Sequence, residues 1–171
     1  MITITAKKKA LGVLIGLFLS MNLQAATTGT IALSGSEPAI LEITVTSEQA
    51  ASNLPLNTSV TDLKVGTVVE RSNKKAGYTI TLGSANALAA ATVTASLRST
   101  ETVDFLPYSI KYGGNPVAFQ SSGGAAVVTT VTSKTSAAGS VKNLTITFDG
   151  ASAFLDQAVY SDVLTFTIIA K

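Results

Sequence analysis

The stretch Tyr160–Lys171, YSDVLTFTIIAK, decides how this chain is expected to fold. From its fifth residue onward, alternate positions are apolar: Leu164, Phe166, Ile168 and Ala170. A period of two over such a length is typical of a half-buried β-strand. Most domains end in a polar, frayed tail, whereas this sequence ends in a strand pattern. The sequence therefore predicts a strand over 163–171.

The same alternation recurs along most of the chain. It predicts strands over 29–35, 39–46, 63–71, 77–84, 91–97, 106–112, 117–119, 126–133 and 141–148. Gly66 indicates a bulge within 63–71. The apolar faces include Leu41, Ile43 and Val45 in 39–46, Tyr78, Ile80 and Leu82 in 77–84, and Leu144, Ile146 and Phe148 in 141–148. Thr and Val, which are abundant here, favour pleated strands. Short connections such as SNKKAG and GGNP have the composition of turns. One helical turn is expected in 84–90 or 47–52, and a loose hairpin in the compositionally simple stretch 120–140.

Many short strands without long helices indicate an all-β fold. The best match is an immunoglobulin-like β-sandwich formed by 37–171. An up-and-down barrel or a stacked solenoid is the alternative, although no fixed internal repeat supports the solenoid.

The first 25 residues have the order of a signal peptide. Lys7, Lys8 and Lys9 precede the apolar run 10–21, and Ala25 provides a small residue for cleavage. The apolar run is shorter than the roughly 20 residues that span a bilayer, which disfavours the alternative of an uncleaved anchor. Without this leader the chain has nine basic and ten acidic side chains. Export through a periplasm to the cell surface is expected, and a nucleic-acid partner is not, because no basic surface is indicated.

The composition also excludes much of enzyme chemistry. The sequence has no His and no Cys. Ser-His-Asp triads, Cys nucleophiles and ordinary zinc sites are therefore ruled out. The ten carboxylates are scattered and match no calcium loop, and no glycine-rich phosphate loop is present. We expect no catalytic residues, no cofactor and no metal.

The segment 26–36 at the start of the mature chain points to another kind of function. It is an alternating stretch, ATTGTIALSGS, that is followed by a break at Glu37 and Pro38. An amphipathic strand, a hinge and a sandwich that lacks a strand is the arrangement that permits donor-strand complementation. In this mechanism the strand of one subunit fills the hydrophobic groove of its neighbour.

Three motifs carry a resemblance to a known family. They are GYTITLGSAN (77–86), LPYSIKYGG (106–114) and YSDVLTFTI (160–168). Together they resemble the fimbrial subunits of chaperone–usher systems, with spore coat U-like domains and the cysteine-free pilins of colonisation-factor fimbriae as the nearest groups. Many spore coat U-like domains contain cysteines, and this chain does not.

The resemblance implies a role for each end of the mature chain. Thr30, Ile31, Ala32 and Leu33 would form the donor strand, while Leu164, Phe166, Ile168 and Ala170 would form the acceptor-side edge strand. The implied partners are identical or related fimbrial subunits, a periplasmic chaperone, an outer-membrane usher and a host or surface receptor. Two alternatives stay open: a sandwich that is complete in itself, and a monomeric secreted module that binds a glycan or a protein.

Overall fold

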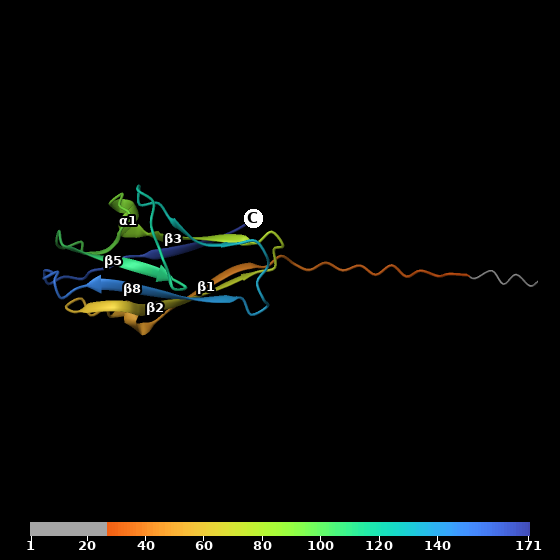
Figure 1. Cartoon of the computed structure of the whole chain (residues 1–171), viewed down its shortest axis with the longest axis horizontal. Coiled ribbons are helices and arrows are strands. Elements are labelled where there is room, and N and C mark those ends of the chain that lie inside the picture. Colours follow the sequence, from red (N-terminus) through yellow and green to blue (C-terminus); the bar gives the residue numbers. More distant parts are fainter. Residues whose placement is uncertain (1–26) are drawn as a thin grey trace, which may run out of the picture. The chain divides into compact units, whose positions relative to one another are not determined.

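The computed structural model describes residues 27–171, and the predicted signal peptide lies outside the described residues. Residues 37–171 form a compact unit of nine strands with two short helical segments (Figure 1). The elements are β1 (Leu41–Ser47), η1 (Gln49–Ser52), β2 (Ser59–Ser72), β3 (Tyr78–Ser84), α1 (Ala85–Ala89), β4 (Ala95–Arg98), β5 (Phe105–Tyr112), β6 (Asn115–Pro116), β7 (Ala126–Val131), β8 (Ser140–Asp149) and β9 (Leu164–Ala170). The expected all-β class is confirmed.

The strands form two antiparallel sheets. The larger sheet has the order β1-β2-β8-β5-β4, with β6 paired to β5, and the smaller sheet has the order β7-β3-β9. All ladders in both sheets are antiparallel. The chain moves from one sheet to the other several times, so that both sheets depend on segments that lie far apart in the sequence.

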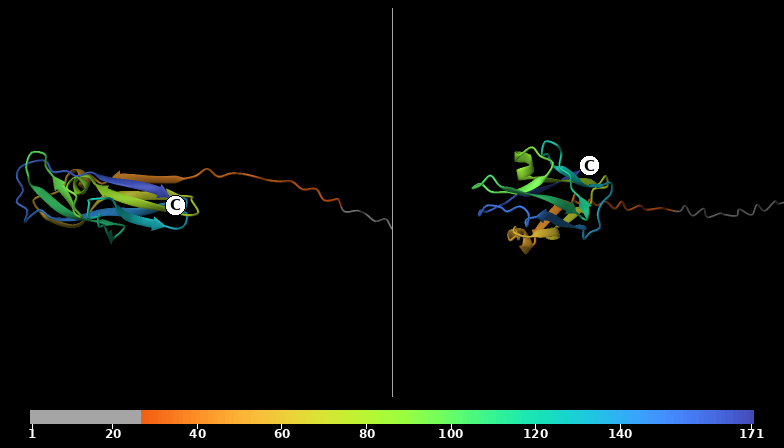
Figure 2. Two further views of the ribbon diagram at one scale, coloured as in Figure 1. Left: turned by 90° about the horizontal axis from the view of Figure 1, so that it is seen from above. Right: turned by 60° about the vertical axis from the view of Figure 1, so that its left-hand side comes forward.

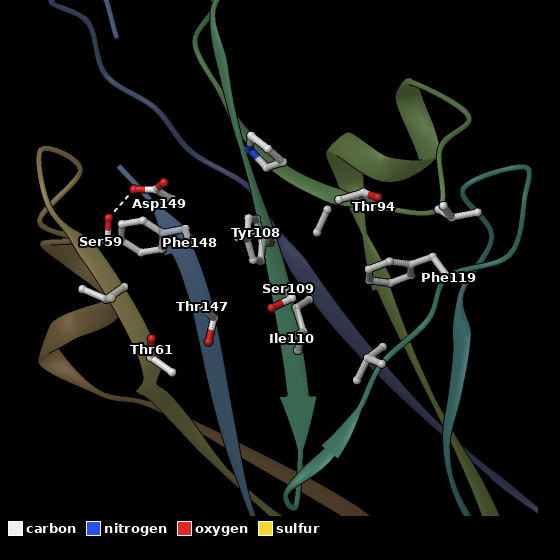
Figure 3. Close-up of a pocket in the computed structure, with 15 residues that line it drawn as sticks. Ser59, Thr61, Thr94, Tyr108, Ser109, Ile110, Phe119, Thr147, Phe148 and Asp149 are labelled. Atoms are coloured by element: carbon white, nitrogen blue, oxygen red, sulfur yellow. Dashed lines mark hydrogen bonds between the residues drawn. The ribbon is translucent and has the colours of Figure 1, made fainter. Parts of the chain in front are cut away.

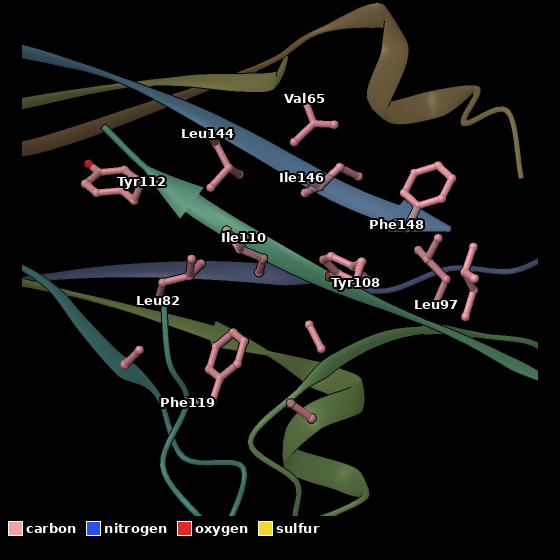
Figure 4. Close-up of a cluster of buried hydrophobic side chains, with 14 of the residues drawn as sticks. Val65, Leu82, Leu97, Tyr108, Ile110, Tyr112, Phe119, Leu144, Ile146 and Phe148 are labelled. Carbon is pink, nitrogen blue, oxygen red and sulfur yellow. The ribbon is translucent and has the colours of Figure 1, made fainter. Parts of the chain in front are cut away.

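The core lies between the two sheets, where the inward faces of the strands meet (Figure 4). The face predicted for 77–84 is correct, because Tyr78, Ile80 and Leu82 are almost completely buried. The inward residues of β5 and β8 are buried in the same cluster, as their alternation predicts. Burial of this apolar surface is the main force that holds the sheets together.

β2 is the longest strand and contains irregularities in its pairing with β8. Its register shifts between Lys64 and Gly66, where the sequence predicts a bulge, and again between Val60 and Leu63. β2 extends the predicted strand 63–71 to Ser59, and it lies between β1 and β8.

Two strand predictions are wrong and a third is wrong in part. Residues 29–35 form no strand, because no neighbouring strand pairs with them in the described part of the chain. Residues 117–119 also form none, since the β6 pairing ends at Pro116, and Phe119 reaches the core from a loop. The strand predicted over 91–97 starts only at Ala95, and Val93 is exposed in the preceding turn.

Both short helical predictions are correct in position. α1 lies within 84–90, where the Ser84 hydroxyl accepts a hydrogen bond from the Ala87 amide at 3.0 Å. This is the usual arrangement of a helix N-cap. η1 lies within 47–52.

A groove between two free strand edges as candidate functional site

The two sheets each end in an unpaired edge on the same side of the domain. Within the described residues, β9 pairs with β3 alone and β1 pairs with β2 alone. β1 and β9 approach each other closely, and Figure 2 shows them next to each other. Each therefore has a row of backbone N–H and C=O groups without a partner strand, facing the gap between the sheets.

A groove of about 500 Å³ opens where these two edges separate. Its walls are the end of β1 with η1 on one side and the start of β9 on the other. Its floor is formed by side chains that belong to the hydrophobic core: Val65, Leu97, Leu144 and Ile146. The groove thus reaches the hydrophobic core of the domain.

One side chain on the inward face of β1 is exposed because no strand covers it. The sequence predicts one inward face with Leu41, Ile43 and Val45, and the first two are half-buried. Val45 is 49% exposed because it lies at the rim of the groove, where no further strand covers it. A side chain on the inward face of a sheet is thus left in contact with water.

The predicted acceptor residues lie together on β9. Leu164, Phe166, Ile168 and Ala170 share its inward face and are each half-buried, whereas Ile169 on the opposite face is 57% exposed. Leu164 and Phe166 line the groove. The Phe166 ring packs against Tyr112 of the other sheet, with 5.6 Å between the ring centroids.

A half-buried carboxylate fixes the chain at the entrance to β9. Asp162 accepts hydrogen bonds from the hydroxyls of Ser84 at 2.6 Å and Tyr108 at 2.7 Å. It also accepts bonds from the backbone amides of Asn86 at 3.1 Å and Val163 at 2.7 Å. Burial and the hydrogen bond to Asp162 raise the pKa of the Tyr108 phenol. This cluster holds the first residues of β9 at the rim of the groove.

A second carboxylate joins the two sheets at the other end of the core. Glu70 of β2 is 0% exposed. It accepts hydrogen bonds from Tyr112 at 2.6 Å, Tyr78 at 2.8 Å and Thr129 at 2.9 Å, which belong to β5, β3 and β7. Burial and the contact with Glu70 raise the pKa of both tyrosine phenols. The sequence patterns do not predict this cluster. Two signals point to it: an acidic residue in register with Val68 on the inward face of β2, and inward-facing tyrosines that need a partner in the core.

The predicted donor residues lie in the described segment 27–36. Thr30, Ile31, Ala32 and Leu33 adopt no regular secondary structure. The large side chains are open to water, with Ile31 88% and Leu33 91% exposed. Two aliphatic side chains on alternate positions are therefore available for burial against another surface.

Another depression, of about 540 Å³, lies over β5 and its neighbours (Figure 3). Hydroxyl groups of Ser59, Thr61, Ser109 and Thr147 surround it. Its charged residue, Asp149, already hydrogen-bonds Ser59 and the Ser152 amide. These bonds lower the pKa of the Asp149 carboxyl. Since its charged group is already engaged by Ser59 and Ser152, this depression is a weaker candidate for a ligand site than the groove.

Every buried side-chain N or O atom in residues 27–171 has a hydrogen-bond partner. No group of His, Cys, Asp and Glu in these residues could hold a metal ion. None of their helices has the length and apolar character to cross a membrane. Comparison of the sequence with protein-family models and with curated proteins finds no match.

Proposed function

We propose that the chain is a structural subunit of a surface fibre, polymerised by donor-strand complementation. In this proposal residues 37–171 form an immunoglobulin-like sandwich that lacks one strand. The strand that completes it is segment 27–36 of another copy, and the fibre serves adhesion or biofilm formation. The observation that carries the proposal is the groove between β1 and β9, which opens onto core side chains.

The groove offers an inserted strand both kinds of contact that it needs. The free edge of β9 provides backbone hydrogen-bonding groups, and a strand added there would extend the β7-β3-β9 sheet. The core side chains below provide an apolar floor for alternate residues of that strand. Leu164 and Phe166 would be covered on the side that now faces the groove.

Segment 27–36 has the matching features. Ile31 and Leu33 are two residues apart, so both point to the same face of an extended strand. Full burial of each aliphatic side chain contributes roughly 1.5–3 kcal/mol. Two such anchors and a ladder of backbone hydrogen bonds would make each link slow to dissociate.

The proposal is tested on the mature chain with its own donor disabled by Ile31→Asp and Leu33→Asp. A synthetic peptide of residues 27–36 is added, and thermal unfolding is followed by circular dichroism. A peptide at 100 times its Kd stabilises the folded state by about 2.7 kcal/mol. For a domain of this size we expect the unfolding midpoint to rise by roughly 5–10 °C.

Two control peptides make the result specific. The Ile31→Asp, Leu33→Asp peptide should leave the midpoint unchanged, because charges cannot enter the apolar groove. The Thr30→Asp, Ala32→Asp peptide carries the same charge on the other face and should still stabilise the domain. A native peptide without effect at millimolar concentration would show a sandwich that is complete in itself. The depression over β5 would then be the candidate ligand site of a monomeric binding module.

A further inference from the structure

The two ends of the domain carry side chains of opposite charge. β2 extends over 14 residues, so its two ends are on the order of 45 Å apart at about 3.3 Å per residue. We call the end near Ser72 the basic pole and the end near Ser59 the acidic pole. Loops from several strands gather at each pole, and in Figure 1 the acidic pole lies on the left, opposite the C-terminus.

The basic pole carries a group of lysines. Lys74 and Lys75 are in the hairpin between β2 and β3. Lys134 is in the loop after β7, which lies against the hairpin because the Thr135 amide donates to the Ser72 carbonyl at 2.9 Å. Lys171 is held there by its amide, which donates to the Gly77 carbonyl at 3.2 Å.

No ion pair neutralises these lysines within residues 27–171. The three ion pairs there are Lys64–Glu48, Arg71–Glu42 and Lys111–Asp62. The Arg71 pair lies at the basic pole and is neutral in sum. Glu37 and the buried Glu70 are the remaining acidic side chains near this pole, and the four lysines outnumber them, so the pole has a net positive charge.

The acidic pole carries the opposite sign. It consists of the loop 53–58, the loop 99–104 and the connection 150–163. The last two loops are tied together, since the Asp156 amide donates to the Asp104 carboxylate at 2.9 Å. The acidic residues at this pole are Glu101, Asp104, Asp149, Asp156 and Asp162. The basic residue among them, Arg98, lies over the Phe105 ring at 4.8 Å.

The acidic pole also presents apolar side chains to water. Val103 is 93% exposed and Phe154 is 97% exposed. The backbone of Phe154 has a φ of 42°, a conformation that is strained for an aromatic residue. Neighbouring hydrogen bonds, such as that from the Ala153 amide to the Gly150 carbonyl at 3.3 Å, hold this loop in shape. A strained loop that displays an aromatic side chain points to a contact surface.

We infer that the acidic pole of one copy docks onto the basic pole of a second copy. Two different, complementary surfaces at opposite ends form a head-to-tail contact, which propagates into a filament instead of closing as a dimer. The contact deepens the proposed function on which it rests, because it aligns neighbouring copies end to end. Asp162 and its neighbours in the connection 150–163 line the groove, so the acidic pole adjoins it. The residues exchanged in the test do not touch the groove, since neither Lys74 and Lys75 nor Glu101 and Asp156 line it.

The test uses the mature chain with Ile31→Asp and Leu33→Asp, so that no donor strand can link the copies. Sedimentation velocity is measured at about 0.01 M salt, where the Debye length is about 30 Å, and at about 1 M, where it is about 3 Å. We expect concentration-dependent oligomers at low salt and monomers at high salt. A chain that stays monomeric at low salt overturns the inference.

Charge reversal at each pole then identifies the surfaces. Lys74→Glu with Lys75→Glu makes both poles acidic, and Glu101→Lys with Asp156→Lys cancels the net charge of the acidic pole. Each variant alone should be monomeric. An equimolar mixture should associate again, because the acidic poles of the first variant meet the basic pole of the second. A mixture that stays monomeric, or a single variant that still associates, overturns the inference.

A matched control shows whether association depends on the charge at the poles or on the net charge of the whole chain. Lys64→Glu with Lys111→Glu makes the same change in the middle of the larger sheet, where both residues lie beside Thr145. This variant should associate as the parent does, and its failure to do so overturns the inference. The salt series needs no variant and stays decisive if a variant fails to fold. The donor strand is disabled in all of these variants. The association measured here is therefore independent of the peptide test, and either proposal can fail without the other.

Discussion

The Glu70 cluster allows a sharp prediction about stability, because one side chain joins four strands from both sheets. The substitution Glu70→Ala removes the acceptor for Tyr78, Tyr112 and Thr129 at once. Each buried donor that loses its partner costs about 1–3 kcal/mol. The cavity left by the side chain adds to this cost. We expect a loss of at least about 4 kcal/mol, which is a large part of the 5–15 kcal/mol that is typical of a whole domain.

The assay is urea unfolding at neutral pH, followed by fluorescence and circular dichroism. Glu70→Gln is the informative partner variant, because its amide oxygen can still accept from Tyr112 and Thr129, while the amide nitrogen can donate to Tyr78. We expect it to retain most of the stability that Glu70→Ala loses. Glu42→Ala removes an exposed ion pair and should change the unfolding midpoint little. A Glu70→Ala variant within about 1 kcal/mol of the parent would refute the view that this carboxylate holds the sheets together.

Two further predictions concern alkaline pH and a loop glycine. The pKa values of Tyr78, Tyr108 and Tyr112 are raised in the folded state, so the folded chain holds these protons more tightly than the unfolded chain, whose phenols have a pKa of about 10. The free energy of unfolding should therefore change little between neutral pH and about pH 9 and fall above pH 10, with a shallower fall for Tyr108→Phe in a series of urea titrations. Gly123 has a φ of 73° and an added Cβ would collide with the Ala87 backbone, whereas Gly114 has a φ of 85° and open space around it. Gly123→Ala should lower the free energy of unfolding by at least about 1 kcal/mol more than Gly114→Ala, and equal losses in thermal melts would contradict the collision.

The strands of the core could be predicted from the sequence because their alternation matches their burial. Leu144, Ile146 and Phe148 were placed correctly by period alone. The bulge at Gly66 was expected from a glycine inside a strand pattern. These features depend on neighbours along the chain, which the sequence shows directly.

The features that were missed depend on contacts between distant segments. An alternating stretch such as 29–35 becomes a strand only where another strand pairs with it, and periodicity does not reveal whether that partner exists. The role of Asp162 was hidden for the same reason, since its hydroxyl partners Ser84 and Tyr108 are 78 and 54 residues away. The buried tyrosines did offer a usable signal, because a phenol in the core needs a partner.

The smaller sheet has a consequence for the order in which the chain folds. β3 lies between β7 and β9 and pairs with both, and its ladder with β9 pairs Tyr78 with Ala170. A ribosome must therefore make most of the domain before β3 can find its second neighbour. Contacts with such long sequence separation slow folding. The smaller sheet would thus stay incomplete until the last strand of the domain has been made.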